Sequence, residues 1–146
     1  MARRTQHPRR EERRARAQAE RLVAEQERGR YRAPDRRDCA ERAWYQSVDD
    51  ADTVRISHRI FRSGGRLVDF VVLVQTLQLD GTWTEAARAD CCHGYVHLHH
   101  ANGQVSAIGP LHDVGDVASL FDVASTQVLT YAVTIRDMKG SGDGDV

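Results

Sequence analysis

The chain has 146 residues, which is enough for one domain with an appendage, and its 21 Lys and Arg residues balance 21 Asp and Glu residues. No apolar run reaches the roughly 18–20 residues of a membrane-spanning helix, and the N-terminus lacks the apolar segment of a signal peptide. We therefore expect a cytoplasmic protein without membrane contact.

The first part of the chain carries most of its positive charge. Residues 1–37 hold 13 Arg and 6 Asp or Glu, so their net charge is +7, whereas residues 38–146 have a net charge of −7. Residues 8–28 are rich in Arg, Glu, Ala and Gln, which favour helix, but their few apolar side chains form no stripe for burial. We expect residues 1–37 to be a flexible, arginine-rich helical arm that either neutralises nucleic-acid phosphates or stays solvated.

A single α+β domain is expected over residues 38–138. Asp38 is followed three residues later by Glu41, which matches a helix capping box. A short helix is therefore predicted at the start of the domain, with Cys39, Ala43 and Trp44 on its buried side. Lysine occurs once in the whole chain, and this use of arginine is typical of GC-rich bacterial codon usage.

Alternating apolar residues then predict a series of strands. The expected strands cover residues 54–61, 67–79, 83–90, 95–100 and 105–108. Turn signals separate them at Ser63-Gly64-Gly65, Asp80-Gly81 and Asn102-Gly103. Short strands joined by glycine-containing turns indicate an antiparallel meander of about four to five strands.

A C-terminal helix is predicted after Pro110, with Asp113 or Asp116 as its cap and Ile135 near its end. Its apolar stripe has helical spacing and consists of Val117, Leu120, Phe121, Ala124, Val128, Tyr131, Ala132 and Ile135. We expect this stripe to cover the sheet face that carries Val96 and Leu98. Residues 139–146 are expected to be a disordered tail.

Residues 88–100 are the richest stretch of the chain in candidate catalytic and metal-binding side chains, because they contain four of its seven histidines and two of its three cysteines. Strand alternation places Tyr95, His97 and His99 on one face and Val96, Leu98 and His100 on the other. Residues on one face are about 6.5–7 Å apart along a strand, so two imidazoles can grip one phosphate, water or metal. His93 and Cys91 join the His97 face if the strand continues back through Gly94, whereas a bulge at Gly94 reverses both.

General acid–base catalysis is the first functional hypothesis. Paired imidazoles can remove and donate protons across a phosphodiester, Arg88 can stabilise an anionic transition state, and Asp90 can orient an imidazole. The candidate catalytic residues are His97, His99, His93, Arg88 and Asp90.

Three other interpretations stay open. A divalent metal is possible, with His97 and His99 as ligands and Cys91, His93 or Asp90 as a third, although no Cys-x-x-Cys or His-Glu-x-x-His spacing occurs. The histidines can also be half-buried sheet residues without catalytic use. Finally, the chain can be a non-catalytic interaction module that works through its arm. No other cofactor is expected.

The same residues carry a resemblance. The string from Cys92 to His99, followed by a turn and a C-terminal helix, resembles a small family of uncharacterised domains from GC-rich bacteria. More remotely, Arg88-Ala89-Asp90 and His97-Leu98-His99-His100 resemble the Arg-x-Asp and paired-histidine strands of TumE-type toxins over residues 54–135. This chain has Cys91 where those toxins carry Asn, and its arm is extra. The resemblance implies an RNA-directed toxic activity, with RNA or an antitoxin protein as the partner.

Overall fold

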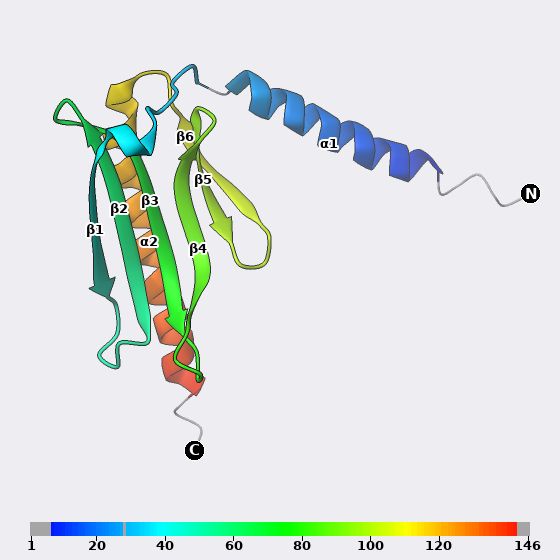
Figure 1. Cartoon of the computed structure of the whole chain (residues 1–146). Helices are drawn as coiled ribbons and strands as arrows, with labels where there is room; N and C mark the ends of the chain where they lie inside the picture. Colours follow the sequence, from blue (N-terminus) through cyan, green and yellow to red (C-terminus); the bar gives the residue numbers. More distant parts are fainter. Residues whose placement is uncertain (1–6, 28, 143–146) are drawn as a thin grey trace, which may run out of the picture.

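The chain folds as an α+β protein, and the computed structural model describes residues 7–27 and 29–142 (Figure 1). Its elements in chain order are α1 (His7–Glu27), the 3-10 helix η1 (Arg36–Asp38), β1 (Ala40–Ser47), β2 (Val54–Ser63), β3 (Arg66–Leu77), β4 (Trp83–Cys92), β5 (Tyr95–His100), β6 (Val105–Pro110) and α2 (Val114–Gly142).

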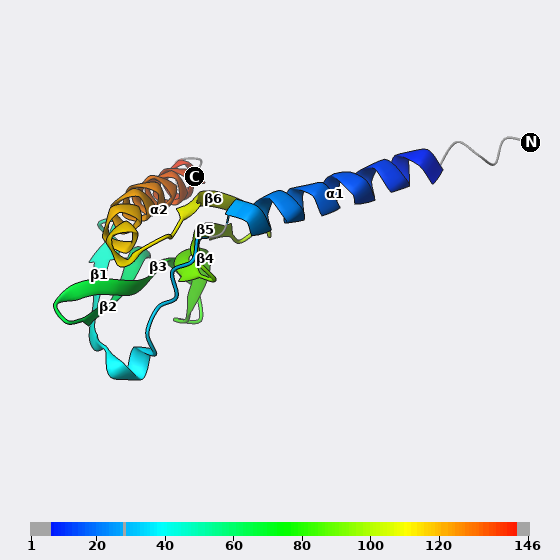
Figure 2. The ribbon, with the colours of Figure 1, turned by 90° about the horizontal axis from the view of Figure 1, so that it is seen from above.

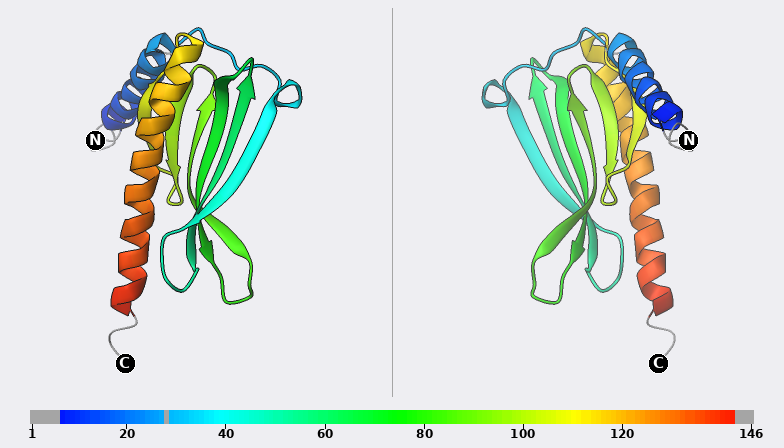
Figure 3. Two further views of the ribbon diagram at one scale, coloured as in Figure 1. Left: turned by 90° about the vertical axis from the view of Figure 1, so that its left-hand side faces the viewer. Right: turned by 90° about the vertical axis from the view of Figure 1, so that its right-hand side faces the viewer.

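Six strands form one antiparallel sheet in which their spatial order equals their sequence order. Helix α2 lies along one face of this sheet, as the side views of Figure 3 show. The core fills the space between the two layers. Its fully buried side chains include Ile56, Phe70, Val72, Val74 and Val96 from the sheet, and Val117, Ala124, Val128 and Ala132 from α2.

The antiparallel sheet and its C-terminal helix confirm the predicted fold class, but the sheet has six strands instead of four to five. The additional strand is β1, which stands where a short helix was predicted. It pairs with β2 over eight residues, and the Trp44 ring stacks on the His58 ring at 4.7 Å. Helical structure at this point is limited to η1, because pairing with β2 satisfies the backbone that follows it.

A two-residue hairpin turn separates β4 from β5. His93 and Gly94 form it with φ angles of 55° and 76°. Positive φ at both central residues is the requirement of a type I′ two-residue hairpin turn. The histidine-rich stretch is therefore two paired strands, and β4 continues to Cys92 before the chain reverses.

Residues 29–38, which we call the strap, precede the sheet in the chain and contact it through hydrogen bonds and an ion pair. The Gly29 amide donates to the Gly94 carbonyl at 3.0 Å, and the Tyr31 hydroxyl donates to the Val68 carbonyl at 2.6 Å. Arg36 forms an ion pair of 2.8 Å with Asp69. These contacts precede residue 38, where the domain was expected to begin. Figure 2 shows η1 on the side of the sheet opposite α2, and α1 leading away from the sheet.

Helix α2 confirms the predicted apolar stripe. Val117, Ala124, Val128 and Ala132 are fully buried, and the other predicted members are partly buried against the core. The helix continues to Gly142, so residues 139–142 of the expected tail are helical. Residues 143–146 lie outside the described part of the chain. Within residues 7–27 and 29–142, neither α-helix is long and apolar enough to cross a membrane.

Candidate active site

The sheet face opposite α2, which we call the open face, carries most of the candidate catalytic residues. His97 on β5 pairs with Asp90 on β4, and His99 pairs with Arg88. Side chains of directly paired residues lie on the same face. Their neighbours Val96 and Leu98 are 0% and 4% exposed beneath α2, so the predicted strand phase is confirmed.

Four predicted residues come together on this face: Arg88, Asp90, His97 and His99, which we call the histidine cluster. The two imidazole centroids are 6.1 Å apart. The His99 Nε2 atom lies 4.0 Å from Asp90 Oδ1, and an Arg88 terminal nitrogen lies 4.0 Å from Asp90 Oδ2. His97 stacks on Tyr95 at 4.6 Å between centroids, which fixes the plane of its ring.

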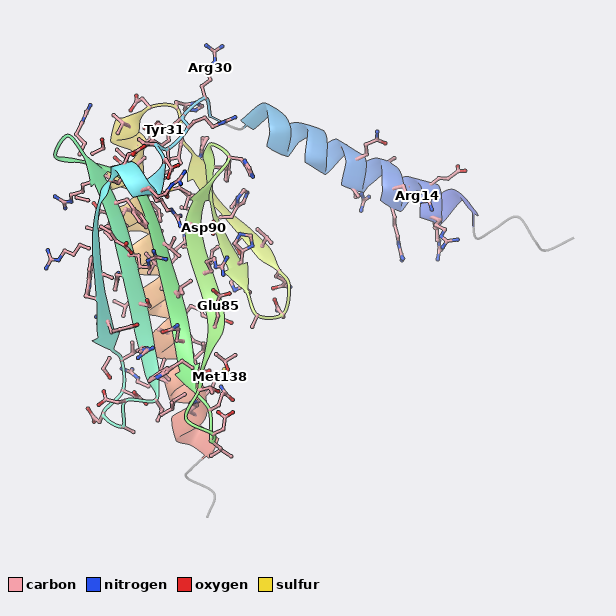
Figure 4. All side chains as sticks on the ribbon, viewed as in Figure 1. Arg14, Arg30, Tyr31, Glu85, Asp90 and Met138 are labelled. Atoms are coloured by element: carbon pink, nitrogen blue, oxygen red, sulfur yellow. The ribbon has the colours of Figure 1, made fainter. Side chains whose placement is uncertain are left out.

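Asp90 is the most buried charged member of the histidine cluster. Its side chain is 19% exposed, whereas those of Arg88 and His99 are both 46% exposed. Its Oδ1 atom is buried and has no hydrogen-bond partner within the described residues. A buried acceptor without a donor costs free energy. A small approach of His99 toward this oxygen would satisfy it, so Asp90 is placed to orient the His99 ring. Figure 4 shows Asp90 on β4, with Glu85 further along the same strand.

The strap adds an arginine that sequence reasoning missed. The hydrogen bond to Asp69 raises the pKa of the Arg36 guanidinium, and the charges of Asp69 and Asp90 raise it further. Arg36 therefore lies within electrostatic reach of the histidine cluster. The sequence offered no signal for this placement, because Arg36 is one of 13 arginines in residues 1–37.

Two candidate residues are not part of the cluster. His93 is exposed in the β4–β5 turn, and Cys91 pairs with Val96 on the α2-covered face. The continuous strand that would have placed both beside His97 is therefore wrong. Burial raises the pKa of the Cys91 thiol far above its ordinary value, and a protonated thiol is a poor metal ligand.

The metal set of His97, His99 and Cys91 is therefore not assembled. No group of three or more His, Cys, Asp or Glu side chains among the described residues has a metal-binding arrangement.

His100, on the α2-covered face, has a structural role. Its Nε2 atom lies 2.9 Å from the Ser106 hydroxyl, and its ring meets Tyr131 edge-on.

The family of the chain follows from comparison with known proteins. A family model described as a domain of unknown function, DUF7718, matches residues 35–132. The chain belongs to the DUF7718 family. No curated protein matches the chain. No solved structure matches it either.

The DUF7718 match covers the whole sheet and most of α2. It includes all four residues of the histidine cluster, together with Arg36 of the strap. Helix α1 lies outside the match. The site therefore belongs to the family domain, whereas the arginine-rich helix is an addition to it. The resemblance to TumE-type toxins stays a prediction.

Proposed function

We propose that this DUF7718 domain is a histidine-dependent ribonuclease of toxin type that cleaves RNA on the open face. The observation that carries the proposal is the pair His97 and His99, whose rings lie 6.1 Å apart on one exposed strand face beside Asp90 and Arg88. This spacing suits two imidazoles that act on opposite sides of one phosphodiester.

The chemistry uses the ribose 2′-hydroxyl as nucleophile. His97 accepts the proton of that hydroxyl while its oxygen attacks phosphorus, and the bond from phosphorus to the 5′ oxygen breaks. His99 donates a proton to this leaving oxygen. The products are a 2′,3′-cyclic phosphate and a free 5′-hydroxyl, so atoms and charge balance without a metal. Arg88 faces the extra negative charge that develops on the phosphate oxygens.

The roles of the two histidines are assigned from their neighbours. His99 Nε2 lies 4.0 Å from the Asp90 carboxylate, which can orient the His99 ring toward the leaving oxygen, so we assign the acid role to His99. His97 then takes the complementary role of base. A protein of this type also requires a neutralising antitoxin protein as its partner in the cell.

Cleavage of a single-stranded RNA by the full chain tests the proposal. His97→Ala and His99→Ala should each lower the cleavage rate by about 10²–10⁴-fold, the usual contribution of a positioned proton-transfer group. His112→Ala is the matched control, because this exposed histidine lies outside the sheet. RNA with 2′-O-methyl groups should not be cleaved. Equal rates for the His99 and His112 variants would refute the proposal.

A second candidate function rests on α1. This helix exposes Arg9, Arg10, Arg13, Arg14 and Arg16. We propose that it binds nucleic-acid phosphates and that, if the domain has no catalytic activity, the chain is an interaction module. These arginines and the histidine cluster can be substituted separately, so the two functions are separable by experiment.

A further inference from the structure

A second polar cluster lies on the open face, at the end of strands β1, β2 and β4 that is away from the strap. The Arg55 guanidinium is 3.9 Å from the centroid of the Tyr45 ring and 3.8 Å from that of the Trp83 ring. Arg55 Nε also donates a hydrogen bond of 2.8 Å to the Gln75 side-chain oxygen. The arginine is therefore held between two aromatic rings, and three strands contribute to the stack.

The stack borders a pocket of about 250 Å³ that Ser47 and Asp52 complete. The Ser47 hydroxyl donates to Asp52 Oδ1 at 2.6 Å, which fixes the carboxylate at the rim. Tyr45 is 63% exposed although it is a large aromatic residue on a regular strand. Drug-sized ligands occupy pockets of about 300–1,000 Å³, so this pocket suits a single planar ring system.

The walls of the pocket fit a nucleobase. Aromatic faces stack on any base. The Arg55 guanidinium offers N–H donors to base carbonyl or ring-nitrogen acceptors, and the Asp52 carboxylate accepts from base N–H groups. A saccharide would use the carboxylate and one ring face, but it would leave the cation–π stack without a role.

The pocket and the histidine cluster share the open face. Trp83 lies five residues before Arg88 on β4, which corresponds to about 16 Å along a strand. A short single strand of RNA can span this distance. The acidic Glu85, paired with Arg88 at 2.9 Å, lies between the two sites, so base contacts rather than phosphate contacts are expected there.

We propose that the stack of Tyr45, Arg55 and Trp83 is a binding site for one unpaired nucleobase of the RNA that the histidine cluster cleaves. This inference rests on the proposed function for the identity of its ligand. The base stacks on an exposed ring face, and Arg55 and Asp52 bind its edge. The site positions the strand so that a phosphodiester reaches His97 and His99.

Equilibrium binding of a single-stranded 2′-O-methyl oligoribonucleotide to the full chain tests this site without cleavage. Tyr45→Ala and Trp83→Ala should each weaken binding by about tenfold to a hundredfold, the usual effect of removing one stacking ring. Tyr45→Phe and Trp83→Phe should bind nearly as tightly as the natural chain, because each keeps a ring. Leu129→Ala is the control, since Leu129 is exposed on α2 at 41%.

An abasic strand with the same sugar-phosphate backbone separates base binding from saccharide or phosphate binding. It should bind about tenfold or more weaker than the complete oligonucleotide. Equal affinity for both strands, unchanged affinity of the Tyr45→Ala chain, or no binding of either strand overturns the inference. Tyr45 is exposed, so this variant should fold normally.

The outcomes also separate the inference from the proposed nuclease. Base-dependent binding through Tyr45 by a chain that cleaves no RNA would keep the nucleobase site and reject the nuclease. Cleavage by the Tyr45→Ala chain with an unchanged KM would keep the nuclease and reject the nucleobase site. If both hold, Tyr45→Ala should raise KM much more than it lowers kcat.

Discussion

His58 is a titratable side chain with an unusual environment. It is 7% exposed, and neither ring nitrogen has a hydrogen-bond partner within the described residues. Its ring stacks on Trp44 with an angle of 5° between the planes. Burial lowers the pKa of His58, because a charged imidazolium is poorly solvated there. The folded protein therefore favours the neutral form of His58 more than the unfolded chain does.

This burial predicts that acid destabilises the protein through His58. The unfolded chain has the higher pKa, near 6.5, so it binds the proton first. The contribution of His58 to the free energy of unfolding should be constant above that pH. Below it, this contribution should fall by at most about 1.4 kcal/mol per pH unit. Denaturant unfolding at about pH 7.5 and pH 5.5 measures the loss.

His58→Phe is the matched variant, because it keeps an aromatic ring against Trp44 but cannot bind a proton. Its free energy of unfolding should fall less between the two pH values than that of the natural chain. His112→Phe should leave the natural pH dependence unchanged, since His112 is exposed. An identical pH dependence in the His58→Phe chain would show that His58 is not the acid-sensitive group.

Among the elements, the β4–β5 hairpin connects the site to the strap. The Gly94 carbonyl accepts hydrogen bonds from the Gly29 and Leu111 amides. A Cβ atom on Gly94 would lie 2.1 Å from the Gly29 carbonyl oxygen. The turn therefore needs glycine for its positive φ and also for the close approach of the strap.

Gly94→Ala should therefore destabilise the domain more than Gly103→Ala. Both glycines have positive φ, at 76° and 86°, but a Cβ atom on Gly103 meets nothing within 4 Å. The Gly103 variant should lose about 1–2 kcal/mol through backbone strain alone. The Gly94 variant should lose more, because the strap must also move. Thermal unfolding of both variants measures the difference, and equal losses would mean that the strap contact contributes nothing.

The elements also show what periodicity can and cannot predict. The period of two in residues 95–100 was sufficient to place His97 and His99 opposite Val96 and Leu98, because alternation is a local property of a strand. The apolar stripe of α2 was readable for the same reason. A helix was wrongly predicted at Ala43 and Trp44, because helix propensity is weak compared with eight residues of pairing to β2.

Other features depend on contacts between distant parts of the chain. Arg36 lies within electrostatic reach of Asp90 only because the strap brings it to Asp69. Tyr45, Arg55 and Trp83 come from three strands whose order and register no local pattern reveals. The turn at His93 and Gly94 did have a local signal, since glycine after a polar residue is common in two-residue hairpins. We predicted a strand or bulge there instead.

Across the whole molecule, the exposed arginines of the N-terminal helix and the candidate catalytic residues lie in different parts of the chain. The exposed arginines of α1 lie outside the DUF7718 match, whereas the histidine cluster lies within it. The open face itself mixes arginines with carboxylates, as in the pairs Arg59 with Glu41 and Arg88 with Glu85. Nucleic-acid binding by phosphate neutralisation is therefore expected from α1 more than from the sheet.

This separation predicts a specific salt dependence. Substitution of Arg9, Arg10, Arg13, Arg14 and Arg16 by Gln in the full chain should weaken RNA binding and flatten the dependence of log affinity on log salt. Each lost phosphate contact should reduce the slope by about 0.7 for single strands. Filter binding over a range of salt concentrations gives both slopes. Parallel lines for the two chains would exclude α1 from RNA binding.

We propose that side chains on the open face catalyse RNA cleavage, whereas side chains on the α2-covered face stabilise the fold. His99 and Leu98 are neighbours on β5, but the His99 side chain is 46% exposed and Leu98 is 4% exposed. They therefore form a matched pair for substitution by alanine. RNA cleavage and the free energy of unfolding should be measured on both variants.

His99→Ala should lower the cleavage rate by about 10²–10⁴-fold and change the free energy of unfolding by less than about 0.5 kcal/mol, as surface substitutions usually do. Leu98→Ala should lose about 2–4 kcal/mol of stability through a core cavity, yet its folded fraction should still cleave RNA. A His99→Ala chain that cleaves RNA at the natural rate, with its stability unchanged, would contradict the account.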